Sequence, residues 1–392
     1  MNLLIRKNII VDKILLLLYS MCILFVTSTT MNRVTLYVLI PVMTVITLMR
    51  NYKVFFTNKY IYLYLFLLLW MFITTISAED VTHSLRQMIR MVSSYVISVI
   101  SFYIASRNRN YIWLYILMIV YFILLLGSAY GSDGLVIAQD VNDREQFDNI
   151  NANAFGYFLF YMSFAVIMLI SIYKEGQVLF GIIAAILLII LSVYIALITA
   201  SRQVLLIQIP FILLILFLIY FKSNSKNTIL FIALFVIMLL YGLPIFNEYY
   251  SNSFLAERTE TSITEDSRFF LIRKGLEEGV KHPILGLGPN NFVLKYDAYT
   301  HCSYTELFAC SGIFALFLYL AIIYHFLKKN IYFYRKTKDK VIMLFIIFGV
   351  IFSFYNFFYV FVGNLWLMAF FYIILGHNEN YIKNNINKLG CY

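Results

Sequence analysis

Apolar runs long enough to cross a membrane follow one another along almost the whole chain. In Val178–Tyr220, for example, an apolar stretch of 43 residues is interrupted mainly at Ser201-Arg202-Gln203. One spanning helix needs about 20 apolar residues. The runs do not alternate apolar and polar residues, which excludes a membrane β-barrel. With 62% hydrophobic and 13% charged residues, the chain has too little polar surface for a soluble globule. The sequence predicts an all-α, polytopic transmembrane helical bundle.

The polar breaks divide the chain into about twelve expected spans within a single integral membrane domain, residues 1–392. The first run follows three basic residues and lacks an A-x-A cleavage site, so we expect a retained signal anchor. The last two expected spans are short. The expected cores are Ile14–Val26, Val34–Met49, Tyr60–Ile76, Met91–Ile104, Ile112–Ala129, Ala154–Tyr173, Val178–Ala200, Val204–Phe221, Ile229–Phe246, Tyr304–Leu327, Val341–Tyr355 and Phe358–Leu375.

The basic residues predict the orientation in the membrane. With both termini cytoplasmic and twelve crossings, 19 of the 30 Lys and Arg residues lie on the cytoplasmic side, together with four of the 20 acidic residues. Lys and Arg accumulate on the cytoplasmic side of membrane proteins. The net charge of +10 is therefore a topology signal, and we expect no nucleic acid partner. The four cysteines form no C-x-x-C pair, which gives no support to a zinc or redox site.

Two extracytoplasmic segments, Tyr130–Asn153 and Asn247–Ser303, are too long to be simple turns, and segments of this length usually carry function. The second is the longer and is the expected functional loop. Within it, Glu265–Lys281 is predicted to be an amphipathic helix. Its apolar stripe consists of residues three and four apart, Phe269, Ile272, Leu276 and Val280. Two interpretations stay open: the helix lies on the outer leaflet, or it is a lid packed on the bundle.

Arginines near the outer surface are candidate phosphate ligands. Arg202 lies at a tight hairpin beside the hydrocarbon, where an ionisable residue is costly and is therefore a functional candidate. The alternative is an interfacial arginine that extends to the water. Arg86 and Arg90 are spaced to share one face of a helix. Guanidinium groups bind diphosphate oxygens in a bidentate manner, although a solvated helix end explains the same pair.

The end of the long loop contains a turn and a histidine. Gly286, Gly288 and Pro289 allow a sharp turn and a close backbone approach to a ligand. No strand precedes these glycines, so they are not a dinucleotide-binding fingerprint. His301 precedes the tenth expected span, and a histidine there can act as a general base. A structural or solvated histidine is the alternative.

Four stretches in this order resemble the O-antigen polymerase and O-antigen ligase superfamily of bacterial inner-membrane glycosyltransferases. They cover roughly residues 150 to 320, and Cys302 stands where the family often has a small polar residue such as Asn. The stretches are Asn151-Ala152-Asn153-Ala154-Phe155-Gly156, Thr199-Ala200-Ser201-Arg202, Ser267-Arg268 through Gly286-Leu287-Gly288-Pro289-Asn290-Asn291-Phe292, and Thr300-His301-Cys302-Ser303-Tyr304-Thr305-Glu306-Leu307 with Gly312.

The resemblance implies a glycosyltransferase C-like fold and transfer of a glycan from an undecaprenyl diphosphate carrier at the outer face of the inner membrane. It implies that no metal or other cofactor is needed. By position, Arg202 and Arg268 would bind the donor diphosphate, with Arg86 or Arg90 as a looser further contact, and His301 would be the catalytic base. The implied partners are undecaprenyl-diphosphate-linked oligosaccharide repeat units, membrane lipids and a chain-length regulator.

Three functions stay open from the sequence. A polymerase moves the growing chain onto a new carrier-linked repeat unit, and a ligase moves it onto lipid A–core. The motifs do not separate them, but the abundance of Ile, Phe, Tyr, Asn and Lys suggests an AT-rich gene and favours the polymerase. A transporter of lipid-linked sugars would place charges at the bilayer midplane. Here the ionisable residues gather at one face, which favours surface chemistry.

Overall fold

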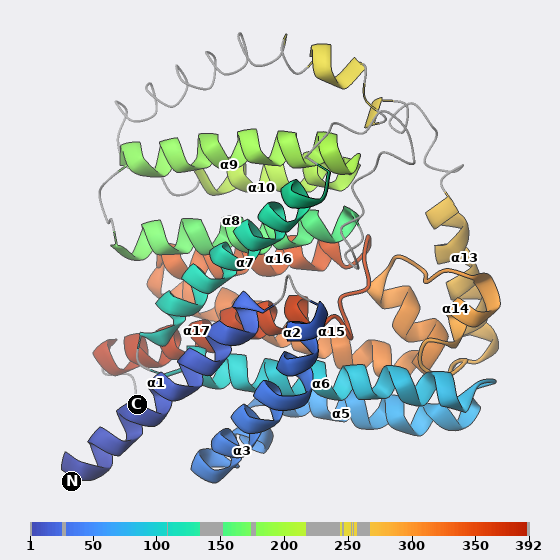
Figure 1. The fold of residues 1–392 in the computed structure, drawn as a ribbon, viewed down its shortest axis with the longest axis horizontal. Helices are drawn as coiled ribbons and strands as arrows, with labels where there is room; N and C mark the ends of the chain where they lie inside the picture. The colour runs from blue at the N-terminus through green and yellow to red at the C-terminus, as the bar shows by residue number, and fades with distance from the viewer. Residues whose placement is uncertain are drawn as a thin grey trace. The chain divides into compact units, whose positions relative to one another are not determined.

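The computed structural model is built from helices, and no strand occurs among the residues it describes (Figure 1). These residues are 2–25, 29–107, 109–133, 152–173, 178–216 and 267–389, with short pieces at 244, 247–251, 253 and 255–256. The first helices are α1 (Asn2–Leu24), α2 (Thr29–Val34), α3 (Ile40–Asn51), α4 (Val54–Thr57), α5 (Lys59–Thr74), α6 (Val81–Ala105), α7 (Asn110–Asp133) and α8 (Ala152–Tyr173). They are followed by α9 (Val178–Thr199), α10 (Ile209–Leu216), α13 (Ser267–Lys281), α14 (Asn291–Tyr296), α15 (Ser303–Thr337), α16 (Lys340–Tyr355) and α17 (Leu365–Leu389).

The helices confirm an all-α polytopic membrane protein. Seven helices in the described part of the chain are long and apolar enough to cross a membrane. They are Met31–Asn51, Lys59–Ser77, Val81–Ala105, Asn110–Ser128, Phe155–Ile172, Phe180–Thr199 and Ser303–Thr337. The total of twelve spans stays a prediction, and the expected span Ile229–Phe246 falls almost entirely outside the described residues.

Several helix ends differ from the expected span cores: α1 begins at Asn2, twelve residues before Ile14, and α15 ends at Thr337, ten residues after Leu327. The helix expected at Met91–Ile104 begins ten residues earlier, at Val81, because the Asp80 side chain caps it by accepting the His83 N–H at 2.8 Å. The last expected span, Phe358–Leu375, begins instead at Leu365. The preceding residues form turns, and Gly363 has a φ of 91° that a helix does not allow.

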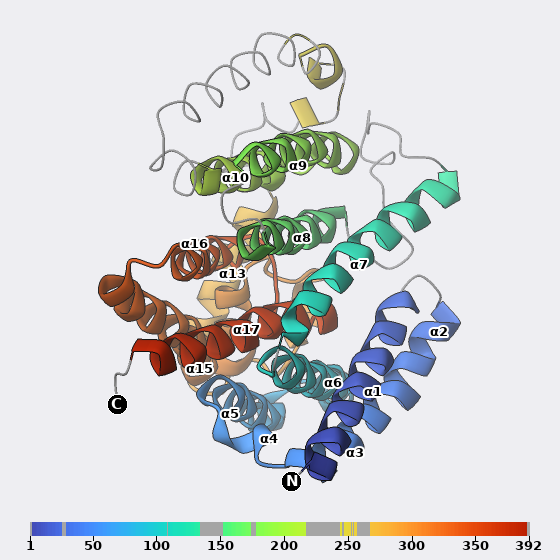
Figure 2. The same cartoon turned by 90° about the vertical axis from the view of Figure 1, so that its left-hand side faces the viewer.

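The chain divides into two compact units, which are described separately. Unit 1 comprises Met1–Leu117, Thr264–Lys338 and Phe352–Tyr392, and unit 2 comprises Met118–Ile263 and Asp339–Ile351. In unit 1, α6 packs along α17, and α5 packs along both α6 and α15 (Figure 2). Gly376 makes the contact of α17 with α6 possible, because a Cβ there would lie 2.6 Å from the Phe102 carbonyl oxygen.

Unit 2 is built around α8 and α9, which pack along each other. Aromatic side chains fill its interior: the Phe160 ring stacks on Phe348 with centroids 5.1 Å apart, and Phe164 lies 4.6 Å from the same ring. The chain leaves α9 through a short turn at Ala200–Ser201 and returns along it as a π-helical turn (Val204–Gln208) and α10. This hairpin carries Arg202.

Candidate functional site

The predicted amphipathic helix is present as α13, but its buried face is not the apolar stripe. Leu271, Gly275 and Glu278 are buried, whereas Phe269 is 51% and Val280 71% exposed. The glycines explain the packing, because a Cβ at Gly275 would lie 2.5 Å from a Thr305 side-chain carbon of α15. The helix therefore packs on α15 and presents the apolar stripe outward. The residues Glu265 and Asp266 lie outside the described part of the chain.

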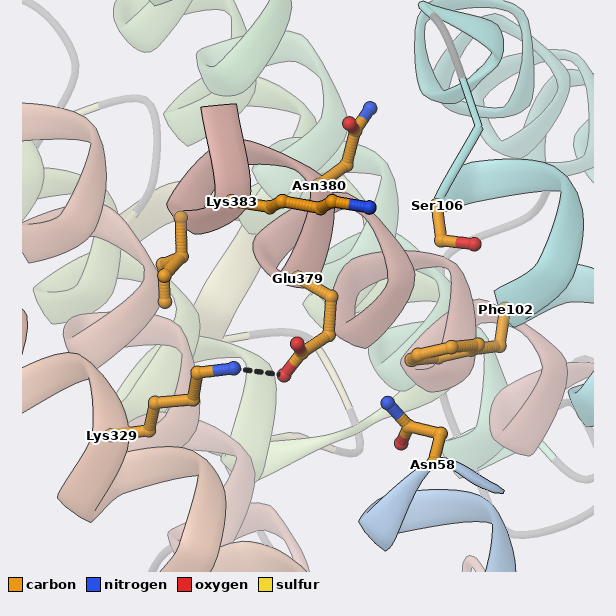
Figure 3. A pocket seen from close by; sticks show the side chains of 8 residues that line it. Asn58, Phe102, Ser106, Lys329, Glu379, Asn380 and Lys383 are labelled. Carbon is orange, nitrogen blue, oxygen red and sulfur yellow. Dashed lines mark hydrogen bonds and ion pairs between the residues drawn. The ribbon is translucent and has the colours of Figure 1, made fainter. Parts of the chain in front are cut away.

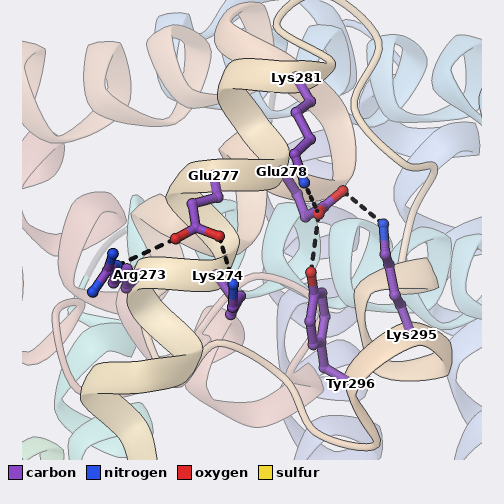
Figure 4. A network of polar contacts seen from close by, with 7 residues as sticks. All are labelled: Arg273, Lys274, Glu277, Glu278, Lys281, Lys295 and Tyr296. Carbon is purple, nitrogen blue, oxygen red and sulfur yellow. Dashed lines mark hydrogen bonds and ion pairs between the residues drawn. The ribbon is translucent and has the colours of Figure 1, made fainter.

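A buried carboxylate joins α13 to α14 (Figure 4). Glu278 is 0% exposed and accepts hydrogen bonds at 2.9 Å from Lys281 and Lys295, which form ion pairs with it, and from the Tyr296 hydroxyl. Burial disfavours the charge, but these three donors outweigh it and lower the pKa of Glu278 to about 2. Burial, together with the hydrogen bond to Glu278, raises the pKa of Tyr296 to about 12. The network fixes α14 against α13.

The glycine-rich loop after α13, residues 283–291, lies directly on the first turns of α15. Gly286 has a φ of 68°, and a Cβ there would lie 2.4 Å from the Cys310 carbonyl carbon. The Leu287 N–H donates to the Ala309 carbonyl at 2.9 Å, and the Ile313 N–H donates to the Pro283 carbonyl at 2.8 Å. Such bonds are possible because Gly312 interrupts the helical geometry of α15, which frees its backbone groups. Backbone hydrogen bonds thus join the loop to the start of α15.

The same loop also contacts the start of α6. The Asn291 side chain donates to Ser84 Oγ and accepts the Asp80 N–H at 3.0 Å. Ser84 Oγ donates to the Pro289 carbonyl at 2.8 Å, and Gly288 leaves room for Ala78. His83 Nε2 lies 2.6 Å from Asn290 Nδ2. These contacts place the exposed Arg86 and Arg90 on the helix that supports the glycine-rich loop.

His301 stands in a strained turn immediately before α15. Its φ of 59° is in the left-handed region, which few non-glycine residues adopt. The imidazole ring is partly exposed and lies against Tyr299, with ring centroids 4.1 Å apart. Non-glycine residues in this conformation are often found at functional sites, where the surrounding structure holds them in place.

Buried polar groups fix the turn on both sides of His301. Before it, the Thr300 N–H donates to the Glu306 carboxylate at 2.8 Å, and both residues are buried. After it, the Ser303 N–H donates to the Asn356 carbonyl at 2.8 Å, while Ser303 Oγ donates to the Tyr359 carbonyl at 2.7 Å. These hydrogen bonds therefore hold the backbone on both sides of His301 while its imidazole stays partly exposed.

Arg202 belongs to unit 2, where two of the sequence stretches meet. Ala200, two residues before Arg202, has a φ of 47°, so this turn also contains a non-glycine residue in the left-handed region. Tyr157 of α8 donates to the Gln203 side chain at 2.5 Å, and a Cβ at Gly156 would lie 2.6 Å from Val204. The Asn-Ala-Asn-Ala-Phe-Gly stretch therefore ends on the Arg202 hairpin. Arg202 is partly exposed.

Within unit 1 the structure brings together His301, the glycine-rich loop, α13 with its partly exposed Arg268, and the start of α6. The buried carboxylates of Glu278 and Glu306, which hold this site together, were not predicted. A single acidic residue in a helical stretch gives no sign of its burial. Within the described residues, no three His, Cys, Asp or Glu side chains gather as metal ligands do. Independence from metal stays a prediction.

Fold and site together define a multi-pass membrane protein with a polar site built where a surface helix and a loop meet the first turns of α15. Residues 184–320 match the family model described as O-antigen ligase, and this match confirms the resemblance to the O-antigen polymerase and ligase superfamily. The matched segment contains Arg202, Arg268 and His301. A comparison with curated proteins finds no match.

Proposed function

We propose that this protein is a surface-polysaccharide polymerase that moves a growing glycan from undecaprenyl diphosphate onto a carrier-linked repeat unit at the outer face of the inner membrane. The family supports an enzyme of the glycosyltransferase kind and covers both O-antigen polymerases and O-antigen ligases. The observation that carries the proposal is the conformation of His301. This residue lies in the matched segment, and its backbone is held in the left-handed region by the hydrogen-bonded turn around it.

The proposed chemistry needs a base and fixed positive charge. The acceptor hydroxyl loses a proton to His301 as it attacks C1 of the donor sugar, and the bond from C1 to the diphosphate oxygen breaks. Negative charge then develops on the departing diphosphate. Arg202 and Arg268 would offset this charge, since preorganised donors stabilise a transition state without a metal. Arg86 or Arg90 would add a further phosphate contact.

Substitution of His301 separates the polymerase from its alternatives. For a polymerase in a Gram-negative host, His301→Ala should leave lipid A–core that bears one repeat unit, because a separate ligase still attaches single units. Loss of a general base costs about 10²–10⁴ in rate, which removes the ladder from a gel. The control is His282→Ala, which removes an exposed histidine that follows α13.

The alternatives give other products. If the protein is the ligase, His301→Ala removes all attached units and leaves polymer on the carrier lipid. If it is a transporter, lipid-linked units accumulate at the cytoplasmic face. An unchanged ladder at normal protein level contradicts the role of His301 as the essential base.

A further inference from the structure

Unit 1 contains a cavity of about 380 Å³ that is lined by residues at α5, α6, α15 and α17. It lies where α5 begins, at Asn58, and where α6 ends, at Ser106. The opposite ends of these two helices contact the glycine-rich loop, through Ser77 and Asp80. The 16 residues of α5 span roughly 24 Å at 1.5 Å per residue. The cavity is therefore separate from the proposed catalytic site.

One uncompensated positive charge faces this cavity (Figure 3). Lys329 Nζ pairs with the Glu379 carboxylate at 2.5 Å, so these two charges offset each other. Lys383, which also lines the cavity, is exposed and makes no ion pair within the described part of the chain. The cavity therefore favours an anion.

Neutral groups add a hydrogen-bond donor and an apolar wall. Asn58 caps α5 by accepting the Tyr60 N–H through its side-chain oxygen at 2.9 Å. Its amide nitrogen is thereby directed toward the cavity as a donor (Figure 3). Phe102 and Ile382, both nearly fully buried, form the apolar part of the lining.

We propose that this cavity binds the phosphate of an anionic phospholipid headgroup. An ammonium and an amide donor suit phosphate oxygens, and basic pockets between membrane helices bind such headgroups. The apolar wall of Phe102 and Ile382 suits the carbon chain attached to the phosphate better than a free ion. The volume is that of a small-ligand site. The site is independent of whether the enzyme is a polymerase or a ligase.

The test compares lipid retention by the full-length protein. Wild type and variants are placed in nanodiscs of mixed phosphatidylglycerol and phosphatidylcholine, and native mass spectrometry counts the lipids that each retains. Wild type should prefer phosphatidylglycerol. Lys383→Gln should weaken this binding about fivefold, as expected for one lysine contact, and Lys383→Arg should preserve it. Lys53→Gln is the matched control, because it removes an exposed lysine outside the cavity.

A second arm distinguishes a lipid from a soluble phosphate. Inorganic phosphate is titrated onto the protein in nanodiscs of phosphatidylcholine alone and followed by ³¹P NMR. A phosphatidylglycerol preference that depends on Lys383 supports the proposal. Binding of inorganic phosphate that depends on Lys383, without a lipid preference, overturns the lipid assignment. An equal loss in Lys53→Gln, or no dependence on Lys383 in either arm, overturns the site.

Discussion

Arg202 offers the most direct test of phosphate recognition by a single residue. Arg202→Lys keeps the charge but loses the planar pair of donors that binds two phosphate oxygens. We expect polymer formation to fall by about 10²–10³, the effect of removing one transition-state donor. The measurement is the amount of polymer at equal protein level, with Arg109→Lys, which alters an exposed arginine, as the control. A near-normal amount of polymer from Arg202→Lys would show that Arg202 only anchors the hairpin at the membrane interface.

Glu306 should act on catalysis through the position of His301. Glu306→Leu removes the acceptor of the Thr300 N–H and should lower polymer formation by about 10²-fold, because small displacements of a catalytic group are costly. Glu306→Gln keeps an acceptor oxygen and should restore most activity. The variants are compared by polymer formed per folded protein. Equal activity of Glu306→Leu and wild type would show that this hydrogen bond does not position the histidine.

His301 shows how much of a site the residue pattern can predict. Its place before a span and within a family-like stretch made it a candidate base. Its left-handed conformation and its buried supports Glu306 and Ser303 could not be predicted, because they depend on contacts between residues up to 56 positions apart. The glycines were more informative, since Gly286 and Gly288 have the positive φ values for which glycine is suited.

At the level of elements, the Glu278 network should make the attachment of α13 to α14 dependent on pH. The pKa of Glu278 is lowered from its ordinary value of 4.5 to about 2. A lowered pKa in the folded state stabilises that state above the ordinary pKa and loses its effect as pH falls toward the folded value. The attachment should therefore be intact above about pH 5 and weaken as pH falls from about 4.5 to 2.

Hydrogen exchange of the α13 and α14 amides measures this attachment. Glu278→Gln should give low protection factors already at neutral pH. They should change little on acidification, once the intrinsic slowing of amide exchange in acid is divided out, because glutamine does not titrate. Glu277→Gln is the control, since Glu277 lies on a more exposed part of the helix, with Arg273 and Lys274 as partners. Slow exchange in Glu278→Gln at neutral pH would contradict a stabilising role for the network.

The existence of the helices was easier to predict than their ends and faces. Apolar length predicted α8, α9 and α16 within a few residues. The start of α6 was missed because ten largely polar residues precede its apolar part and only the Asp80 cap reveals the helix. In α13 the apolar stripe suggested the face that would pack on the bundle if the helix were a lid. The helix packs instead through the face that contains Gly275 and Gly279, because these glycines allow its backbone to approach α15 closely. Close backbone packing of this kind leaves large side chains such as Phe269 outside.

For the whole molecule, the charge asymmetry predicts that the α13 region is extracytoplasmic. His282→Cys should react with a membrane-impermeant maleimide added to intact spheroplasts, whereas Lys53→Cys should react only after the membrane is permeabilised. Both positions are exposed. Cys391 is replaced by serine, and the free thiols of Cys22, Cys302 and Cys310 are buried. Labelling of His282→Cys only after permeabilisation would overturn the orientation.

Polymer synthesis by the purified protein tests the proposed function most directly. Proteoliposomes receive the protein and undecaprenyl-diphosphate-linked repeat units, with no lipid A–core and no other enzyme. The wild type should convert these units into carrier-linked chains of several repeats and release undecaprenyl diphosphate, and His301→Ala should lose at least about 10²-fold of this activity. Wild-type protein that forms no chains until lipid A–core is supplied would contradict a polymerase and identify a ligase.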